Sequence, residues 1–274
     1  MSLKDLLVHV DASDQGRRRL DAAAALAARH GAHLIGLFVV PELHLSGYIV
    51  TQIPDEIEQM HRVAMRTQAE QAEAAFAETL SAAGIGGEWR RVKGVLAPTI
   101  ALHARYVDLA VIGQHDQGEG SGEPTDHLLL TIGRPSLVIP AEGAFPVIGE
   151  RILVAWDASR LAARAINDAL PLLRRAAKVI VLAVNSPRKG EDLGGLGIGD
   201  ICQHLVRHGI DVEAQDVQGE DISVGGVLQS CAEEQDVDLI VTGAYGHARW
   251  REIVLGGVTR HLLTHMTVPV LMSH

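Results

Sequence analysis

The chain contains the same series of segments twice, and this internal repeat limits its fold more than any other feature. A short apolar run that ends in Asp-Ala-Ser occurs at residues 6–13 and again at residues 152–159. Three further pairs of similar segments follow in the same order in both halves. One such pair could arise by chance, but four in one order indicate a tandem duplication. The three further pairs are residues 34–40 and 179–185, 107–113 and 237–243, and 134–139 and 268–272.

The repeated apolar segments have the character of strands in a parallel sheet. They are continuous and rich in β-branched residues instead of alternating with polar ones, which is the pattern of strands buried on both faces. Helical stretches separate them, so each half alternates strand and helix from a first to a fifth strand. The helices are expected at 17–30, 55–83, 161–177 and 258–266, with Gly31 and Gly84 as stops and Pro171 as a kink.

The sequence therefore predicts two repeated α/β domains, at residues 1–141 and 150–274. Each is expected to be a five-stranded parallel sheet with right-handed crossovers and helices on both faces. Residues 141–150 contain Gly and Pro without periodicity and form the expected linker. The last strands of the two domains, 137–139 and 270–272, are expected to meet as an intrachain pseudo-dimer. A further homodimer is left open.

Composition excludes several classes of function. The formal net charge is −10, which argues against a nucleic-acid partner or an anionic membrane surface. The two cysteines, Cys202 and Cys231, cannot make a disulfide framework and form no CxxC metal motif. No apolar run reaches the roughly 18 residues of a membrane span, and charge interrupts the N-terminal apolar run. These features predict a soluble, reduced, cytoplasmic protein.

The candidate binding sites lie where the first and fourth strands of each half end. In an open parallel sheet, ligands bind beyond the carboxyl ends of the strands, where the strand order switches. Asp11 and Asp157 follow the first strand of each half, and Gly113 and Gly243 end the fourth. We therefore expect any site to include these positions.

Glycines surround the candidate site of the second half. Gly243 and Gly246 follow the fourth strand, and Gly256 and Gly257 come after nine further residues, just before a helix. Glycines let backbone N–H groups approach an anion, and a helix start offers the positive end of its dipole. One interpretation is a phosphate cradle in which Asp157 accepts hydrogen bonds from ribose hydroxyls. The other interpretation is that the glycines only form turns and that Asp157 is a surface residue. Spacing alone does not decide between the two interpretations.

The two halves together resemble the universal stress protein family over essentially the whole chain. The tandem halves, the Asp-Ala-Ser after the first strand, and Gly-x2-Gly-x9-Gly followed by Val-Thr carry the resemblance. It implies adenine nucleotide alpha hydrolase-like, Rossmann-like domains and, in the ATP-binding branch, an ATP site. At the matching positions it implies that Asp157 meets the ribose and phosphates and that Val184 contacts adenine through its backbone. Gly243, Gly246, Gly256 and Val258 would hold the phosphates or shape the loop around them.

One position departs from the ATP-binding pattern. The family's ATP binders carry Ser or Thr directly after the third glycine, where this chain has Gly257. A hydroxyl-to-phosphate hydrogen bond stabilises by roughly 1.5–3 kcal/mol, so its loss predicts about 10- to 100-fold weaker binding. The N–H of Gly257 remains, so the site is expected to be weakened and not abolished. Thr259 is two positions too far along to be counted on as a substitute.

The first half departs further. The segment after Gly113 reads Gln114-His115-Asp116, so the second glycine of Gly-x2-Gly is missing, and the loop from there to residue 126 carries four acidic residues and no lysine or arginine. The corresponding loop of the second half carries two arginines and one glutamate, so it attracts a polyphosphate that the first repels. The sequence predicts one nucleotide site, in domain 2. Domain 1 is expected to serve packing, with Asp11 as a remnant of a degenerate site.

The sequence favours a binding protein over an enzyme. Beyond Asp157, nothing beside the motif supplies a general base or a carboxylate cluster for a metal. His261 and His265 have zinc-chelating spacing without a third ligand, and no metal site is predicted. The leading hypothesis is a stress-response regulatory protein that binds ATP, with or without Mg²⁺, without efficient turnover. The alternatives are a nucleotide-free interaction protein and a weak Mg²⁺-dependent ATPase, and the sequence names no protein partner.

Overall fold

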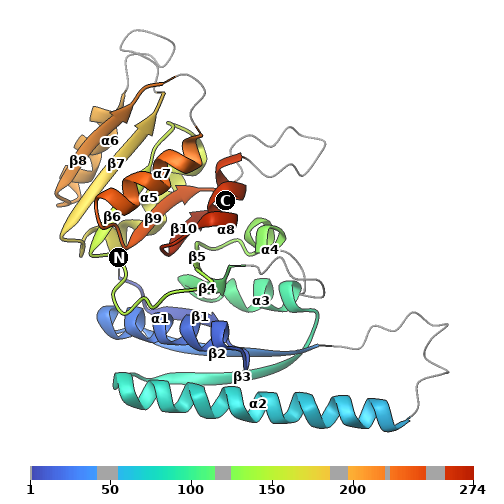
Figure 1. Cartoon of the computed structure of the whole chain (residues 1–274). Helices are drawn as coiled ribbons and strands as arrows, with labels where there is room; N and C mark the ends of the chain where they lie inside the picture. The colour runs from blue at the N-terminus through green and yellow to red at the C-terminus, as the bar shows by residue number, and fades with distance from the viewer. Residues whose placement is uncertain (1, 42–54, 115–124, 186–196, 220–222, 245–256) are drawn as a thin grey trace.

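A computed structural model describes residues 2–41, 55–114, 125–185, 197–219, 223–244 and 257–274 of the protein. The two repeats form one ten-stranded sheet in the order β3-β2-β1-β4-β5-β10-β9-β6-β7-β8 (Figure 1). All pairings inside each repeat are parallel. The strands are β1 (Asp5–His9), β2 (His33–Pro41), β3 (Gly87–Gly94), β4 (Leu109–Gly113), β5 (Ser136–Ile139), β6 (Arg151–Ala155), β7 (Lys178–Val184), β8 (Val212–Val217), β9 (Leu239–Gly243) and β10 (Val270–Ser273).

Helices cover both faces of the sheet, which confirms the predicted α/β class. One hydrophobic core lies between the sheet and α1, α2, α5 and α6, and a second lies between the opposite face and α3, α4, α7 and α8. Both cores include residues of both repeats. The helices are α1 (Asp14–His30), α2 (Asp55–Ala83), α3 (Leu96–Ala104), α4 (Thr125–Thr131), α5 (Arg160–Leu173), α6 (Ile198–Arg207), α7 (Val224–Glu234) and α8 (Gly257–His265).

Local sequence signals set the helix ends. The Asp-Ala-Ser segments start α1 and α5 in the same way, because the hydroxyls of Ser13 and Ser159 accept hydrogen bonds from backbone N–H groups of the first turn. Gly31 and Gly84 follow α1 and α2 with φ of 60° and 63°, a left-handed conformation that suits glycine. These stops confirm the predicted ends of both helices.

Helix α5 ends earlier than expected. It stops at Leu173 and not at residue 177, so Pro171 lies in its last turn instead of kinking its middle. After Leu173 the backbone tightens, since Arg175 N–H donates to the carbonyl of Leu172 three residues back. Ala177 N–H then bonds to the linker, and the chain enters β7.

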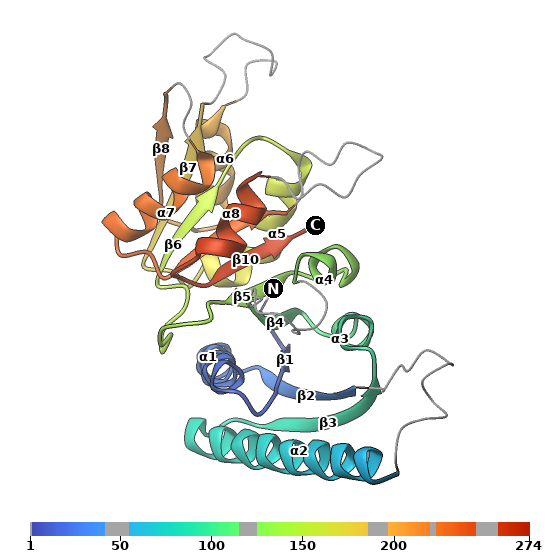
Figure 2. The ribbon, with the colours of Figure 1, turned by 45° about the vertical axis from the view of Figure 1, so that its right-hand side comes forward.

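The two repeats join where β5 meets β10. These strands pair antiparallel, with Leu137 opposite Leu271 and Val138 opposite Val270. They are the strands that the sequence analysis expected to meet. Figures 1 and 2 show the first repeat on one side of this seam and the second on the other. Because the last strand of each repeat is paired on both sides, β3 and β8 are the edge strands among those that the structure describes.

The seam gives a first prediction. Leu271 is 1% exposed and lies at the centre of the β5–β10 pairing. We expect Leu271→Ala to lower the free energy of unfolding by about 2–5 kcal/mol, because it leaves a cavity in a core that both repeats share. Urea denaturation followed by circular dichroism measures this. Val206→Ala is the control: Val206 is 57% exposed and should change stability by less than about 0.5 kcal/mol.

Candidate functional site

A pocket opens in the second repeat where the strand order switches. Strand β6 pairs with β7 on one side and with β9 on the other. The segments that follow β6 and β9 therefore run in opposite directions from the neighbouring carboxyl ends of these two strands. The β6–β9 pocket lies beyond these ends and has a volume of about 240 Å³. Its lining residues are Ala155, Trp156, Asp157, Ser159, Leu161, Ala162, Leu182, Val184, Val224, Leu228, Thr242, Gly243, Gly257, Val258 and Thr259.

Every predicted site residue that the structure describes lines this pocket. They are Asp157, Val184, Gly243, Gly257 and Val258, which come from four separate segments of the chain. Gly246 and Gly256 were also predicted, but they lie outside the described residues, as do the loops whose charges differ between the halves. The pocket thus brings together positions that lie far apart in the sequence and that the sequence analysis assigned to one nucleotide site.

Asp157 presents a carboxylate at the mouth of the pocket. The turn between β6 and α5 passes through Ala158, whose φ is 59°. One oxygen of Asp157, Oδ1, accepts a hydrogen bond of 2.9 Å from the N–H of Ser159. The residue is exposed, and within the described part of the chain its other oxygen has no hydrogen-bond partner. Asp157 therefore offers one acceptor oxygen to a ligand.

The two described glycines of the motif have different surroundings. A Cβ at Gly243 would lie 2.7 Å from the backbone carbon of Leu161 and 2.8 Å from the nitrogen of Ala162, so only glycine lets β9 end this close to α5. A Cβ at Gly257 would meet no atom of the described residues within 4 Å. Gly243 is thus fixed by packing, whereas the position of Gly257, at the start of α8, has room for a side chain.

The described lining of the pocket combines an apolar set of residues, called here the apolar wall, with a polar set. Leu182, Val184, Val224 and Leu228 form the wall from β7 and α7. The polar residues of the lining are Asp157 and three residues that carry hydroxyl groups. Sequence reasoning did not single out the wall residues other than Val184, nor Trp156 or Thr242. Their signal was present, since Trp156 precedes Asp157 and Thr242 precedes Gly243. The hydroxyl-bearing residues are Ser159, Thr242 and Thr259.

Other titratable candidates do not gather into a site. The rings of His261 and His265 lie 4.6 Å apart between centroids, but the described residues contain no group of three metal-ligating side chains. Burial raises the pKa of the thiols of Cys202 and Cys231, which lowers their reactivity.

Of the helices that the structure describes, none has the length and apolar character to cross a membrane.

Comparison with known proteins agrees with the repeat and the fold. The sequence profile of the universal stress protein family matches residues 2–139 and, separately, 149–274. The chain belongs to the universal stress protein family. Because the profile matches twice, it is a tandem member.

Relatives of full length are known for this tandem universal stress protein. The universal stress protein Slr1230 of Synechocystis sp. (strain ATCC 27184 / PCC 6803 / Kazusa) is 24% identical, and the match covers 98% of this chain and 99% of the relative. A universal stress protein structure from Archaeoglobus fulgidus DSM 4304 matches with a TM-score of 0.76 and 18% identity over 98% of this chain and 95% of that chain. A functionally unknown protein, PA1789 from Pseudomonas aeruginosa PAO1, matches with a TM-score of 0.63 and 16% identity over 99% and 92%. At these identities the two structures show the fold alone.

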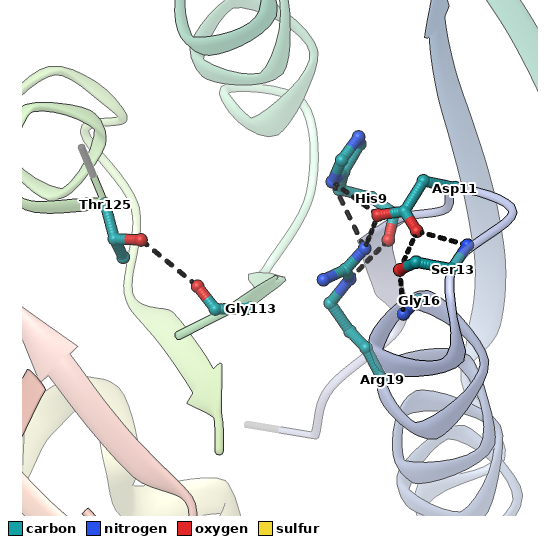
Figure 3. Close-up of polar contacts among 7 residues, drawn as sticks. All are labelled: His9, Asp11, Ser13, Gly16, Arg19, Gly113 and Thr125. Atoms are coloured by element: carbon teal, nitrogen blue, oxygen red, sulfur yellow. Dashed lines mark hydrogen bonds and ion pairs between the residues drawn. The ribbon is translucent and has the colours of Figure 1, made fainter. Parts of the chain in front are cut away.

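In the first universal stress protein repeat, an arginine fills the corresponding place (Figure 3). Arg19, from α1, is 5% exposed and donates from Nη2 to Asp11 Oδ2 at 2.6 Å and from Nε to the carbonyl of His9 at 2.6 Å. A Cβ at Gly113 would overlap Nη1 of the same side chain. The guanidinium thus lies between the ends of β1 and β4, where the strand order switches in this repeat.

Two substitutions between the repeats account for this difference. His9 and Arg19 of the first repeat correspond to Ala155 and Ala165 of the second, so the second repeat lacks both side chains that fill the space. The carboxylates differ accordingly. Asp11 is ion-paired, whereas Asp157 is open to solvent.

Burial and the charge of Arg19 together set the ionisation of its neighbours. Burial, and after it the charge of Arg19, lower the pKa of His9 to about 3, so its ring is neutral at physiological pH. For Asp11, burial acts to raise the pKa, but the charge of Arg19 and the hydrogen bonds from Ser13 outweigh it and lower the pKa. The result is a single ion pair, Arg19 with Asp11, beside a neutral histidine.

This ion pair gives a second prediction. Because the pKa of Asp11 is lowered in the folded state, the pair stabilises the fold above the ordinary aspartate pKa of about 3.9. That stability is lost as the pH falls through the lower folded-state value. We expect Arg19→Ala to lower the free energy of unfolding by about 2–3 kcal/mol at pH 7, and the difference from wild type to shrink toward pH 3.

Urea unfolding at pH 3, 5 and 7 measures the effect. Arg17→Ala is the matched control, since Arg17 pairs with Glu78 at the surface with 44% of its side chain exposed, and its loss should cost less than about 1 kcal/mol. A destabilisation by Arg19→Ala that is the same at all three pH values would contradict the assignment.

Proposed function

We propose that this universal stress protein is a regulatory protein of the stress response that binds an adenine nucleotide, ATP, in the β6–β9 pocket of its second repeat. The observation that carries the proposal is the meeting of Asp157, Val184, Gly243, Gly257 and Val258 in one pocket at the switch point. Their segments are far apart in the sequence, and each was selected for a nucleotide.

The chemistry of the lining supports this ligand. The apolar wall suits the faces of a purine, whose edge the backbone at Val184 can hydrogen-bond. The exposed oxygen of Asp157 can accept from ribose hydroxyls. Helix α8 begins in the pocket at Gly257 and Val258, where the positive end of the helix dipole favours a phosphate, with or without Mg²⁺.

The same lining supports binding without efficient turnover. Asp157 is the one ionisable side chain among the described lining residues, so the described lining offers no second group to complete an acid–base pair or to bind a metal ion. The protein would therefore hold ATP and pass its state on through contacts with a protein partner. We place it in the cytoplasm, with the two repeats acting as an intrachain pseudo-dimer.

A three-part experiment tests the proposal. Ligand released from purified protein on denaturation is identified by mass spectrometry, ATP is titrated calorimetrically with and without Mg²⁺, and phosphate release is followed. Binding without phosphate release supports the proposal. Steady phosphate release would identify a weak ATPase instead. Binding no tighter than millimolar, and undiminished by Asp157→Ala, would leave a nucleotide-free interaction protein.

Removal of the pocket carboxylate gives a third prediction. We expect Asp157→Ala to weaken ATP binding by about 10- to 100-fold, since it removes hydrogen bonds between a charged acceptor and the ribose. Calorimetric titration of both proteins measures the change. Asp211→Ala removes the same charge from an exposed position outside the pocket and should leave the affinity unchanged.

The open space at Gly257 gives a fourth prediction. We expect Gly257→Ser to tighten ATP binding by about 10- to 100-fold, because the hydroxyl can donate to a phosphate and the position has room for it. Gly199→Ser is a close control, since Gly199 also lies in the first turn of a helix, α6, with nothing within 4 Å of a built Cβ. Equal affinity of Gly257→Ser and wild type would argue that no phosphate reaches the start of α8.

A further inference from the structure

Gln114 connects the first repeat to the helix that opens the pocket of the second. It follows β4 directly, and its backbone N–H donates to the carbonyl of Ile139 at 2.8 Å. Its side-chain Nε2 donates to the carbonyl of Leu263 at 2.8 Å and to that of Thr264 at 3.3 Å. Its Oε1 accepts from the N–H of Ala141 at 3.0 Å. Both ends of the amide are thus bonded, which fixes its orientation.

These hydrogen bonds reach carbonyl groups at the C-terminal end of α8, where the helix itself supplies no donors. The last four carbonyls of a helix have no intrahelical partner, and those of Leu263 and Thr264 belong to this group in α8. The carbonyl of His265 is satisfied from within the second repeat, by Gln229 Nε2 of α7 at 2.9 Å. One of the two glutamines that cap α8 therefore comes from the other repeat.

The capped helix is short, and few of its residues are fully buried. It spans nine residues, about 13 Å at 1.5 Å per residue, and only Thr259 and Leu262 of its residues are buried. Its first residues, Gly257 to Thr259, line the β6–β9 pocket. Because a helix of this length moves as a rigid unit, contacts at its last turn help to set where its first turn lies.

The contact is not reciprocated at the corresponding position of the second repeat. Ala244 follows β9 as Gln114 follows β4, and its N–H makes the same backbone bond, to the carbonyl of Ser273 at 2.8 Å. Alanine has no side-chain donor, so this position cannot cap α4 as Gln114 caps α8. The Gln114 bridge between the repeats thus reaches from the first repeat toward the pocket of the second.

We propose that Gln114 is a positioning residue through which the first repeat holds α8 and sets the nucleotide affinity of the β6–β9 pocket. This inference rests on the proposed function, since it assigns a regulator to the same site. Coupling of this kind is reciprocal. A nucleotide that orders the start of α8 also strengthens the contact with Gln114, so the first repeat senses occupancy of the second.

Two substitutions of Gln114 separate the hydrogen bonds from the shape of the side chain. Gln114→Ala gives the first repeat the residue that the second has at this position. Gln114→Glu keeps the size and the acceptor for Ala141 but loses the donor and places negative charge against the carbonyls of α8. We expect ATP binding to weaken by about 3- to 30-fold in Gln114→Ala and by more in Gln114→Glu. Gln203→Ala, which removes an amide from the exposed surface of α6, is the control and should bind as wild type does.

Hydrogen exchange supplies a readout that a merely structural role would not move. ATP is expected to slow exchange at α8 and at the N–H of Ala141 in wild type, with the Ala141 effect lost in Gln114→Ala. Affinities are measured at 20 °C, with circular dichroism to verify that each variant is folded. If wild type binds ATP and both variants bind it equally well, this inference is overturned while the proposed function stands. If wild type does not bind ATP, both fall together.

Discussion

The antiparallel pairing of β5 with β10 is the contact on which the arrangement of the molecule depends. It turns two five-stranded sheets into one, buries the last strand of each repeat on both sides, and lets each hydrophobic core run through both repeats. It also brings the end of β4 beside the end of α8, because β4 is the neighbour of β5 in the sheet and α8 directly precedes β10. Without this pairing, Gln114 could not reach the carbonyls of the other repeat.

The two switch points have similar backbones, but side chains fill the first and leave a pocket at the second. In each repeat an aspartate follows the first strand, and a serine two residues on caps the next helix. In the second repeat, alanines at 155 and 165 leave a pocket there. In the first, the larger side chains of His9 and Arg19 fill the space, and Asp11 neutralises the charge that this introduces. The difference between an open and a filled site lies in side chains and not in topology.

Much of the fold could be predicted because its signals are local. The apolar runs, the Asp-Ala-Ser segments and the stops at Gly31 and Gly84 each act within a few residues, and their order in two copies was enough for the class and the strand count. The end of α5 was misjudged because the chain leaves the helix to reach β7, a tertiary requirement that the composition of residues 174–177 does not reveal. The site could be predicted in part, since its residues stand at strand ends.

The filling of the first switch point was not foreseen, although the sequence carried a signal for it. The absence of a second glycine after Gly113 predicted a degenerate site, but Arg19 lies in the middle of a helix, where an arginine usually faces solvent. Only a position-by-position comparison of the two halves sets His9 and Arg19 against alanines. Gln114 was noticed only as part of residues 114–116, the segment that lacks the second glycine of the motif. Its partners are about 150 residues away in sequence, beyond the reach of any local pattern.

Covalent fusion of the two repeats has a consequence for how they can differ. In an assembly of two identical chains, an arginine at the switch point would occur in both copies and fill both sites at once. In one chain the two halves mutate separately, so one half can lose its cavity while the other keeps it. Each molecule then carries one filled switch point and one open switch point. Dilution cannot separate them, so the unequal pair persists at any concentration in the cell. Fusion in one chain thus lets one switch point be filled and the other open in a fold that otherwise repeats itself.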